Sequence, residues 1–192
     1  MMCLSQNSRK NEFTEEERRI LLNLAHESIR CALEGSKLPR ESPPDHLAEN
    51  RGAFCTLYLD GQLRGCVGYI FPVTPLFQTI EETARGAAFD DPRFPAVTHS
   101  ESARLKISLS ILSPLRPATP DQVEVGEHGL LISQSGRRGV LLPQVPVEHA
   151  WDRITFLEQT CLKAGLPRQA WQTGATLQVF TAEVFGDDPA LA

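Results

Sequence analysis

The sequence lacks three features that would each define a class of protein. No apolar run approaches the length of about 20 residues that a membrane helix needs. Basic residues are not in excess, since 19 of them stand against 24 acidic residues and give a net charge of −5. The N-terminal stretch MMCLSQNSRKNEF has no apolar core of a secretory signal. We therefore expect neither a membrane nor nucleic-acid phosphates as partners, and we predict a cytoplasmic location.

Cysteine is present, but without a pairing pattern. The cysteines are odd in number and widely scattered, and no CxxC pair occurs. This spacing indicates neither a disulfide framework nor a zinc knuckle, and it favours a reducing compartment. The five are Cys3, Cys31, Cys55, Cys66 and Cys161.

The rest of the composition is that of an ordinary globular protein, with 41% hydrophobic and 22% charged residues among 192. This length suits one compact unit or two small lobes. The clearest helix is predicted to begin after Thr14, which can form a capping box with Glu17, and to end at Gly35. Two further helices are predicted at residues 75–89, with Thr74 as the N-cap, and at residues 152–164.

Strands are predicted in hairpins rather than in alternation with helices. Asp60-Gly61 is typical of a two-residue type I′ turn and joins the first hairpin, while residues 134–138 are predicted to connect the second. This clustering favours antiparallel pairing and an α+β fold. The predicted strands are residues 53–59, 62–71, 106–112, 129–133, 139–142 and 176–184.

The run Leu63-Arg64-Gly65-Cys66-Val67-Gly68 is unusual for a strand. Its two glycines leave the backbone beside Cys66 bare, so that a ligand or another chain segment can approach closely. Counting from a two-residue turn places Cys55 opposite Cys66, and it puts Arg64 on the same face as Cys66, where a guanidinium would favour the thiolate. The alternative is structural, because buried free cysteines are usually small hydrophobes and strand glycines often mark a bulge.

At this hairpin the sequence resembles the AMMECR domain family, whose hallmark differs here only by Val67 in place of isoleucine. The resemblance covers about residues 10–186 as a single domain and leaves residues 1–9 as an N-terminal tail. Further matching segments are residues 52–54, 91–95, 107–114, 136–139, 142–145, 148–152 and 161–166.

The resemblance implies a larger lobe made from both chain ends and a smaller lobe inserted between them. Each lobe would hold an antiparallel sheet with flanking helices, and the motif would lie near the cleft. No reaction is established for the family. Its prokaryotic members, called AmmeMemoRadiSam system protein A, are associated by gene neighbourhood and fusion with a Memo-family protein and a radical S-adenosylmethionine enzyme, which are therefore the implied partners.

The candidate catalytic residues are Cys66 as a nucleophile and His149 as its base, because a catalytic thiol needs a group that takes its proton. Arginines at the second hairpin could grip a carboxylate or phosphate with two parallel hydrogen bonds. Each residue also has a structural interpretation: a helix-entry histidine, a polar hairpin tip, or a loop brace between Asp91 and Arg93. The candidate binding residues are Arg64, Gly65, Gly68, Asp91, Arg93, Arg137, Arg138 and Glu148, of which Asp91 and Glu148 could also orient the base.

Neither a metal nor a cofactor is predicted. Cys66, His149 and Cys161 are of the types that bind zinc or iron, but Cys161 falls on the apolar stripe of the helix predicted at residues 152–164. Two functions follow for the chain. It is an enzyme or enzyme-accessory factor that uses Cys66 on a small anionic substrate, or it is a non-catalytic module whose cleft docks a partner protein or product.

Overall fold

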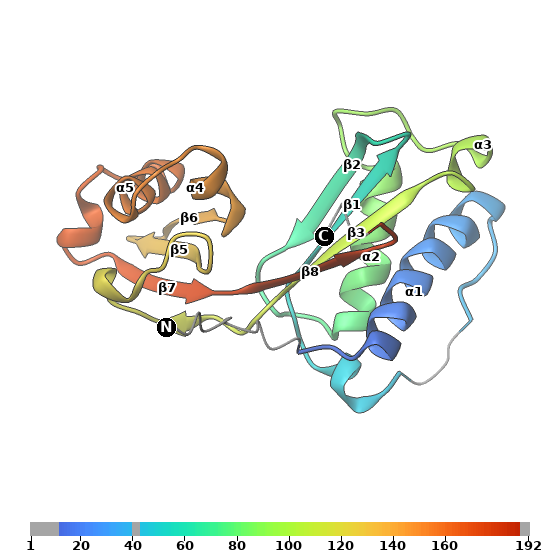
Figure 1. The fold of residues 1–192 in the computed structure, drawn as a ribbon, viewed down its shortest axis with the longest axis horizontal. Coiled ribbons are helices and arrows are strands. Elements are labelled where there is room, and N and C mark those ends of the chain that lie inside the picture. The colour runs from blue at the N-terminus through green and yellow to red at the C-terminus, as the bar shows by residue number, and fades with distance from the viewer. Residues whose placement is uncertain (1–11, 40–42, 189–192) are drawn as a thin grey trace, which may run out of the picture.

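A computed structural model describes residues 12–39 and 43–188 of the chain, which Figure 1 colours along its length. These residues form two lobes, each with an antiparallel sheet of four strands. The predicted α+β class is therefore confirmed. The tail proposed at residues 1–9, which contains Cys3, lies outside the described residues.

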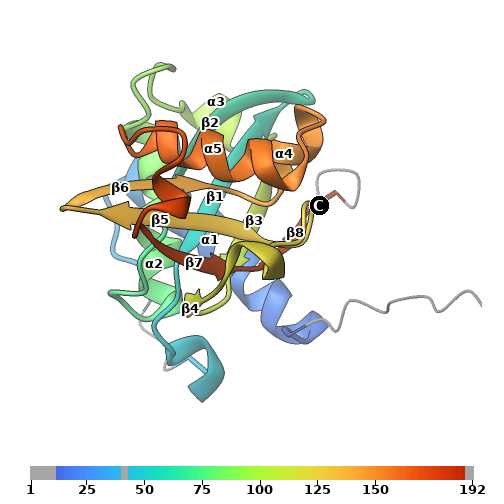
Figure 2. The ribbon, with the colours of Figure 1, turned by 90° about the vertical axis from the view of Figure 1, so that its left-hand side faces the viewer.

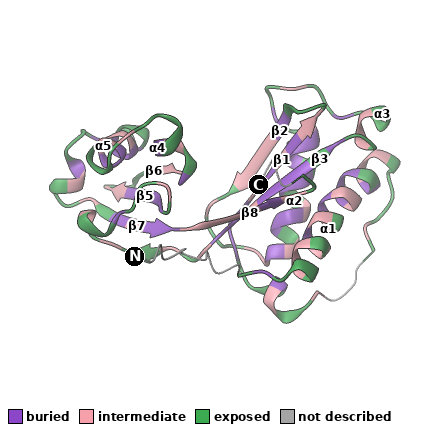
Figure 3. Cartoon of the chain, viewed as in Figure 1, coloured by how far each residue is buried: buried purple, intermediate pink, exposed green. Residues whose placement is uncertain are grey.

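The larger lobe is a sheet with two long helices on one face (Figure 1). Its elements are α1 (Glu15–Glu34), η1 (Asp45–Ala48), β1 (Ala53–Leu59), β2 (Gln62–Tyr69), α2 (Leu76–Phe89), α3 (His99–Ser102), β3 (Lys106–Leu112) and β8 (Ala182–Gly186). The strands lie in the order β2-β1-β3-β8. The core lies between sheet and helices, where Leu21, Ile80 and Leu109 are fully buried. Figure 3 shows this burial in the central strands β1 and β3 and along α2.

The smaller lobe repeats this plan with shorter elements. They are β4 (Arg116–Pro117), η2 (Pro120–Gln122), β5 (Gly129–Gln134), β6 (Arg137–Leu141), α4 (Gln144–Glu148), α5 (Arg153–Lys163), η3 (Ala170–Gln172) and β7 (Thr176–Phe180). The strand order is β4-β7-β5-β6, and α5 packs on one face (Figure 2). A second core is centred on Ile132, Phe156 and Val179.

Two chain segments join the lobes, one from β3 to β4 and the other from β7 to β8 (Figure 1). They are hydrogen-bonded to each other, because the Ser113 N–H donates to the Thr181 carbonyl and the Thr181 N–H donates to Ser113 Oγ, both at 2.9 Å. At Thr181 the chain passes from β7 in the sheet of the smaller lobe to β8 in the sheet of the larger lobe. The single strand predicted over residues 176–184 is therefore wrong. Residues that favour strands continue across Thr181, so the change of sheet has no local signal in the sequence.

Helix boundaries follow capping chemistry. Thr14 caps α1 in the predicted capping box, with the Glu17 N–H donating to Thr14 Oγ1 at 3.2 Å. Helix α2 begins one residue later than predicted, because Pro75 and not Thr74 is its N-cap. The Thr74 hydroxyl instead shares a hydrogen bond with the Thr79 hydroxyl at 2.9 Å.

The second hairpin turns through two residues, so the five-residue connection predicted over residues 134–138 is wrong. Ser135 and Gly136 both have positive φ, at 50° and 78°, as a type I′ turn requires. Strand pairing therefore reaches the turn, and Arg137 and Arg138 belong to β6. Their side chains consequently have the fixed directions of strand residues.

Candidate functional site

Strand β2 carries the motif, and its pairing with β1 differs from the predicted register. The Asp60-Gly61 turn forms as predicted, with φ of 51° and 79°. The register then shifts close to the turn, where β2 contains an extra residue. Cys66 consequently lies opposite Thr56, and Cys55 lies opposite Val67. The predicted Cys55–Cys66 pair is wrong, because a slip of one residue turns the two side chains to opposite faces of the sheet.

The two cysteines are free thiols in different surroundings. Cys55 faces the helices and is fully buried, and this burial raises the pKa of its thiol. Cys66 is half-buried on the face that the helices leave open. Its Sγ accepts a hydrogen bond from Thr56 Oγ1 at 3.4 Å. Of the two thiols, that of Cys66 is therefore the candidate for chemistry.

The two motif glycines are places of close packing. A Cβ on Gly65 would lie 3.0 Å from the carbonyl carbon of Ala87 in α2, and still closer to its oxygen. A Cβ on Gly68 would overlap the ring of Phe54. The sequence predicts that the bare backbone at these glycines is open to a ligand or to another chain segment. In the structure, α2 occupies the space at Gly65 and the Phe54 ring occupies the space at Gly68.

Arg64 is directed to α3. Its Nε and Nη2 donate to the two carboxylate oxygens of Glu101 at 2.9 and 3.2 Å, and Nη2 also donates to the Ala96 carbonyl at 3.3 Å. Arg64 is buried, with 8% of its surface exposed. Glu101 accepts hydrogen bonds from the Arg64 side chain and from the Thr98 backbone N–H. These bonds, chiefly those from Arg64, lower the pKa of Glu101 to about 2. The charge expected beside the Cys66 thiol is therefore neutralised in an internal ion pair.

Asp91 forms a hydrogen bond with the backbone of β2, which is an edge strand of the sheet. One of its carboxylate oxygens accepts the Cys66 N–H at 2.9 Å, and Arg93 donates to the carboxylate from its backbone N–H, Nε and Nη2 at 3.1, 3.0 and 2.7 Å. The pKa of Asp91 is lowered, chiefly by the Arg93 side chain and next by the Cys66 N–H. The loop brace considered for Asp91 and Arg93 is thus present, and both groups are engaged within the larger lobe.

The pairing of Glu101 predicts an acid-dependent loss of stability. Because the pKa of Glu101 is about 2 in the folded protein and 4.5 ordinarily, its contribution is complete above pH 4.5 and disappears as the pH falls toward 2. At neutral pH, Glu101→Gln should lower the free energy of unfolding by about 1–2 kcal/mol, a value reduced for partial exposure of the carboxylate. Glutamine can still form the capping box of α3 with Thr98, so the substitution removes the charge of residue 101 and keeps the cap.

Urea denaturation at several pH values measures this effect. The difference between wild type and Glu101→Gln should shrink between pH 4.5 and pH 2. A difference that stays constant over this range would contradict the proposed role of the Arg64–Glu101 pair.

Glu148 and His149 lie at the end of α4 in the smaller lobe. The two residues end a short helix, in which the His149 N–H donates to the Val145 carbonyl at 3.2 Å. The His149 ring is exposed and stacks on Trp151, with centroids 4.7 Å apart. Within residues 12–39 and 43–188, no hydrogen bond or ion pair joins either residue to Cys66. Among the described residues, the predicted base and the thiol therefore have no direct polar interaction, and the assignment of His149 as base stays a prediction.

Arg137 and Arg138 make different contacts from β6. Arg137 Nη1 donates to the Gly165 carbonyl at 2.6 Å. The Arg138 Cζ atom lies 5.3 Å from the centre of the Phe71 ring, which belongs to the larger lobe. Arg138 is therefore the predicted site residue that links the two lobes.

Cys161, the third possible metal ligand, is fully buried in the core of the smaller lobe. Burial raises the pKa of its thiol. In the part of the chain that the structure describes, no three His, Cys, Asp or Glu side chains are grouped as metal ligands would be.

Three residues of this region were missed by sequence reasoning: Thr56, Phe71 and Glu101. The pattern Thr98-x-x-Glu101 is a visible capping signal, but nothing local connects Glu101 with Arg64, which is 37 positions away. The position of Thr56 opposite Cys66 depends on the bulge, and no residue type in the motif shows which position is extra.

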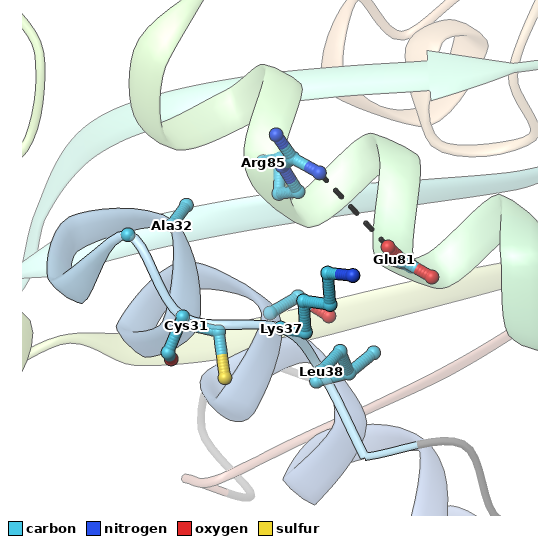
Figure 4. Close-up of a pocket in the computed structure, with 9 residues that line it drawn as sticks. Cys31, Ala32, Lys37, Leu38, Glu81 and Arg85 are labelled. Atoms are coloured by element: carbon cyan, nitrogen blue, oxygen red, sulfur yellow. Dashed lines mark ion pairs between the residues drawn. The ribbon is translucent and has the colours of Figure 1, made fainter.

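Two hollows lie beside helices α1 and α2, away from the motif. One of about 790 Å³, shown in Figure 4, is bordered by Cys31, Lys37, Glu81 and Arg85, the last two forming a 4.0 Å ion pair. The other, of about 680 Å³, is lined mainly by apolar residues of both helices and by prolines. No residue of the 63–68 run lines either hollow. Among the described helices, none combines the length and apolar content needed to cross a bilayer.

Comparison with known proteins identifies the family. The AMMECR1 family model matches residues 22–185. Protein MK0488 of Methanopyrus kandleri is 42% identical over 189 residues, covering 92% of this chain and 91% of that protein, and Protein MJ0810 of Methanocaldococcus jannaschii is 41% identical, covering 90% of each. The crystal structure of uncharacterized protein PH0010 from Pyrococcus horikoshii matches with a TM-score of 0.76 and 37% identity, over 88% of this chain and 90% of that one. The chain therefore belongs to the AMMECR1 family, as its motifs predicted.

Proposed function

We propose that this AMMECR1-family chain is a non-catalytic accessory protein that binds a Memo-family protein and a radical S-adenosylmethionine enzyme. The observation that carries the proposal is the internal pairing of the charged groups around the motif. Arg64 is held by Glu101, and Asp91 is held by Arg93 and the Cys66 N–H. Groups engaged in this way stabilise the fold, and releasing a buried one for a substrate would leave its partner unpaired.

The motif holds the elements of the larger lobe together, and a structural role of this kind is consistent with an accessory protein. Through its close contacts, β2 is joined to α2 at Gly65, to α3 at Arg64 and to the 90–95 loop at Cys66. A rigid lobe of this kind presents a preformed surface to a partner, which lowers the cost of ordering on binding. The identity of the partners is taken from the family resemblance.

Thiol chemistry at Cys66 on a small anionic substrate is the second candidate function. It is favoured by the half-buried position of Cys66 on the open face of the sheet, with the Thr56 hydroxyl 3.4 Å from Sγ. Arg137 and Arg138 would bind the anionic group of the substrate. In this function His149 would have to reach Sγ by a movement of the smaller lobe.

Co-purification separates the two candidates. The chain would be co-expressed with a tagged Memo-family protein and the radical enzyme of the same organism, as wild type and as Cys66→Ser. We expect both forms to be recovered with the partners in equal amount, and we expect equal formation of the radical enzyme's product, measured by mass spectrometry. Cys31→Ser, which replaces a buried thiol of α1, is the matched control.

Two results would contradict the accessory function. If wild type is not recovered with either partner, the proposal fails. If Cys66→Ser keeps the complex but loses the product while Cys31→Ser does not, the thiol takes part in chemistry and the second candidate replaces the first.

A further inference from the structure

The end of β2 and the connection from it to α2 expose three large apolar side chains. Tyr69, Phe71 and Val73 have exposed fractions of 40%, 37% and 71%. Single exposed apolar residues are normal on protein surfaces, whereas three of them within five consecutive residues give one short stretch of chain the apolar exposure expected of an interaction site. The three lie within residues 69–73, which we call the 69–73 segment.

Arg138 of β6 lies beside this segment. Its Cζ atom is 5.3 Å from the centre of the Phe71 ring, within the range of a cation–π contact. Arg138 is exposed, although the chain folds it against the other lobe. The contact therefore brings an exposed positive side chain of the smaller lobe and an exposed ring of the larger lobe together in one surface.

Within the described residues, no carboxylate forms an ion pair with the arginines of this surface. The ion pairs within residues 12–39 and 43–188 use other arginines, among them Arg18, Arg64 and Arg93, whereas Arg137 and Arg138 form none. This matters because the chain as a whole carries a net charge of −5. A positive spot on a negative protein selects for an acidic partner at this position.

We infer that Arg138 and the 69–73 segment bind a segment of a partner protein in which a carboxylate lies next to an apolar side chain. A cation–π contact does not use the N–H groups of a guanidinium as hydrogen-bond donors to a carboxylate, so Arg138 can still donate two parallel hydrogen bonds to one. Aromatic residues and arginine are the side chains that most often dominate the energy of protein interfaces. The inference rests on the proposed accessory function and adds the surface and the chemistry by which a partner is bound.

Fluorescence polarisation with a defined probe tests this inference. The probe is a short fluorescein-labelled peptide that alternates glutamate with phenylalanine and leucine, and its counterpart carries glutamine in place of glutamate. We expect the glutamate peptide to bind about tenfold more tightly, because it alone forms charge-assisted hydrogen bonds, and to weaken as salt is added.

Charge reversal locates the binding. Arg138→Glu should lower the affinity for the glutamate peptide by about tenfold or more, because the substitution places like charges together. Lys37→Glu makes the same change of net charge on an exposed residue beside the hollow of Figure 4 and should have no effect. Thermal unfolding of both variants checks that the fold is retained. Equal binding of the two peptides, or equal loss in the two variants, would overturn the inference.

The same variants distinguish this inference from the proposed function. If the Memo-family protein and the radical enzyme do not co-purify but peptide binding depends on Arg138, the proposed partners are wrong and the surface is correct. If the complex forms and Arg138→Glu leaves it intact, the accessory function holds and this surface is not the one that binds.

Discussion

Gly65→Ala should lower the free energy of unfolding by about 3 kcal/mol or more, the cost expected when a side chain is forced into a filled space. The added Cβ would lie 3.0 Å from the Ala87 carbonyl carbon and closer still to the oxygen. Both atoms belong to the backbone of α2, so no flexible side chain can move aside. Helix and strand would have to separate, and they enclose the core of the larger lobe. Urea denaturation followed by far-UV circular dichroism measures the loss.

The control for this variant is Gly61→Ala in the same hairpin. Gly61 has a φ of 79° and no atom within 4 Å of an added Cβ, so alanine there tests backbone conformation without a collision. We expect a cost of about 1 kcal/mol. If Gly65→Ala costs no more than Gly61→Ala, β2 does not sit on α2 as closely as described.

Gly139→Ala should destabilise the smaller lobe by a similar amount, about 3 kcal/mol. Its Cβ would lie 2.6 Å from the Thr160 carbonyl oxygen and 2.8 Å from Ala164 Cα, both backbone atoms at the end of α5. The two tryptophans of the chain, Trp151 and Trp171, pack against the core of this lobe. Tryptophan fluorescence during urea denaturation therefore measures the smaller lobe directly.

Gly136→Ala is the matched control, because Gly136 has a φ of 78° and open space around it in the same hairpin. The urea concentration at the midpoint of its fluorescence transition should change much less than in Gly139→Ala. A fluorescence transition unchanged by Gly139→Ala would show that β6 does not pack on α5 as described. Gly65→Ala adds a second measurement: it shifts the fluorescence transition only if the two lobes unfold together.

Short-range chemistry allowed parts of the fold to be predicted to the residue. The start of α1 depends on Thr14 and Glu17, and the first hairpin depends on Asp60-Gly61. In each case the interacting residues are three positions apart or fewer. The Asp91–Arg93 brace was foreseen as one alternative for the same reason, since both groups lie on one loop.

The site depends on contacts that the sequence does not display. Arg64 meets Glu101 across 37 positions, and the Cys66 N–H meets Asp91 across 25. The register of β2 depends on a bulge, and alternation predicts a regular strand in its place. That one extra residue places the two cysteines on opposite faces of the sheet, so that Cys55 is buried against the helices and Cys66 is half-buried on the open face.

Ser113 and Thr181, where the chain enters and leaves the smaller lobe, are hydrogen-bonded neighbours. The smaller lobe is therefore equivalent to a long insertion at the tip of a single hairpin. Its whole length could be exchanged for another module without cutting any strand of the β2-β1-β3-β8 sheet. An architecture of this kind lets the two halves of the molecule diverge at different rates, with new binding specificities arising in one while the other preserves its core.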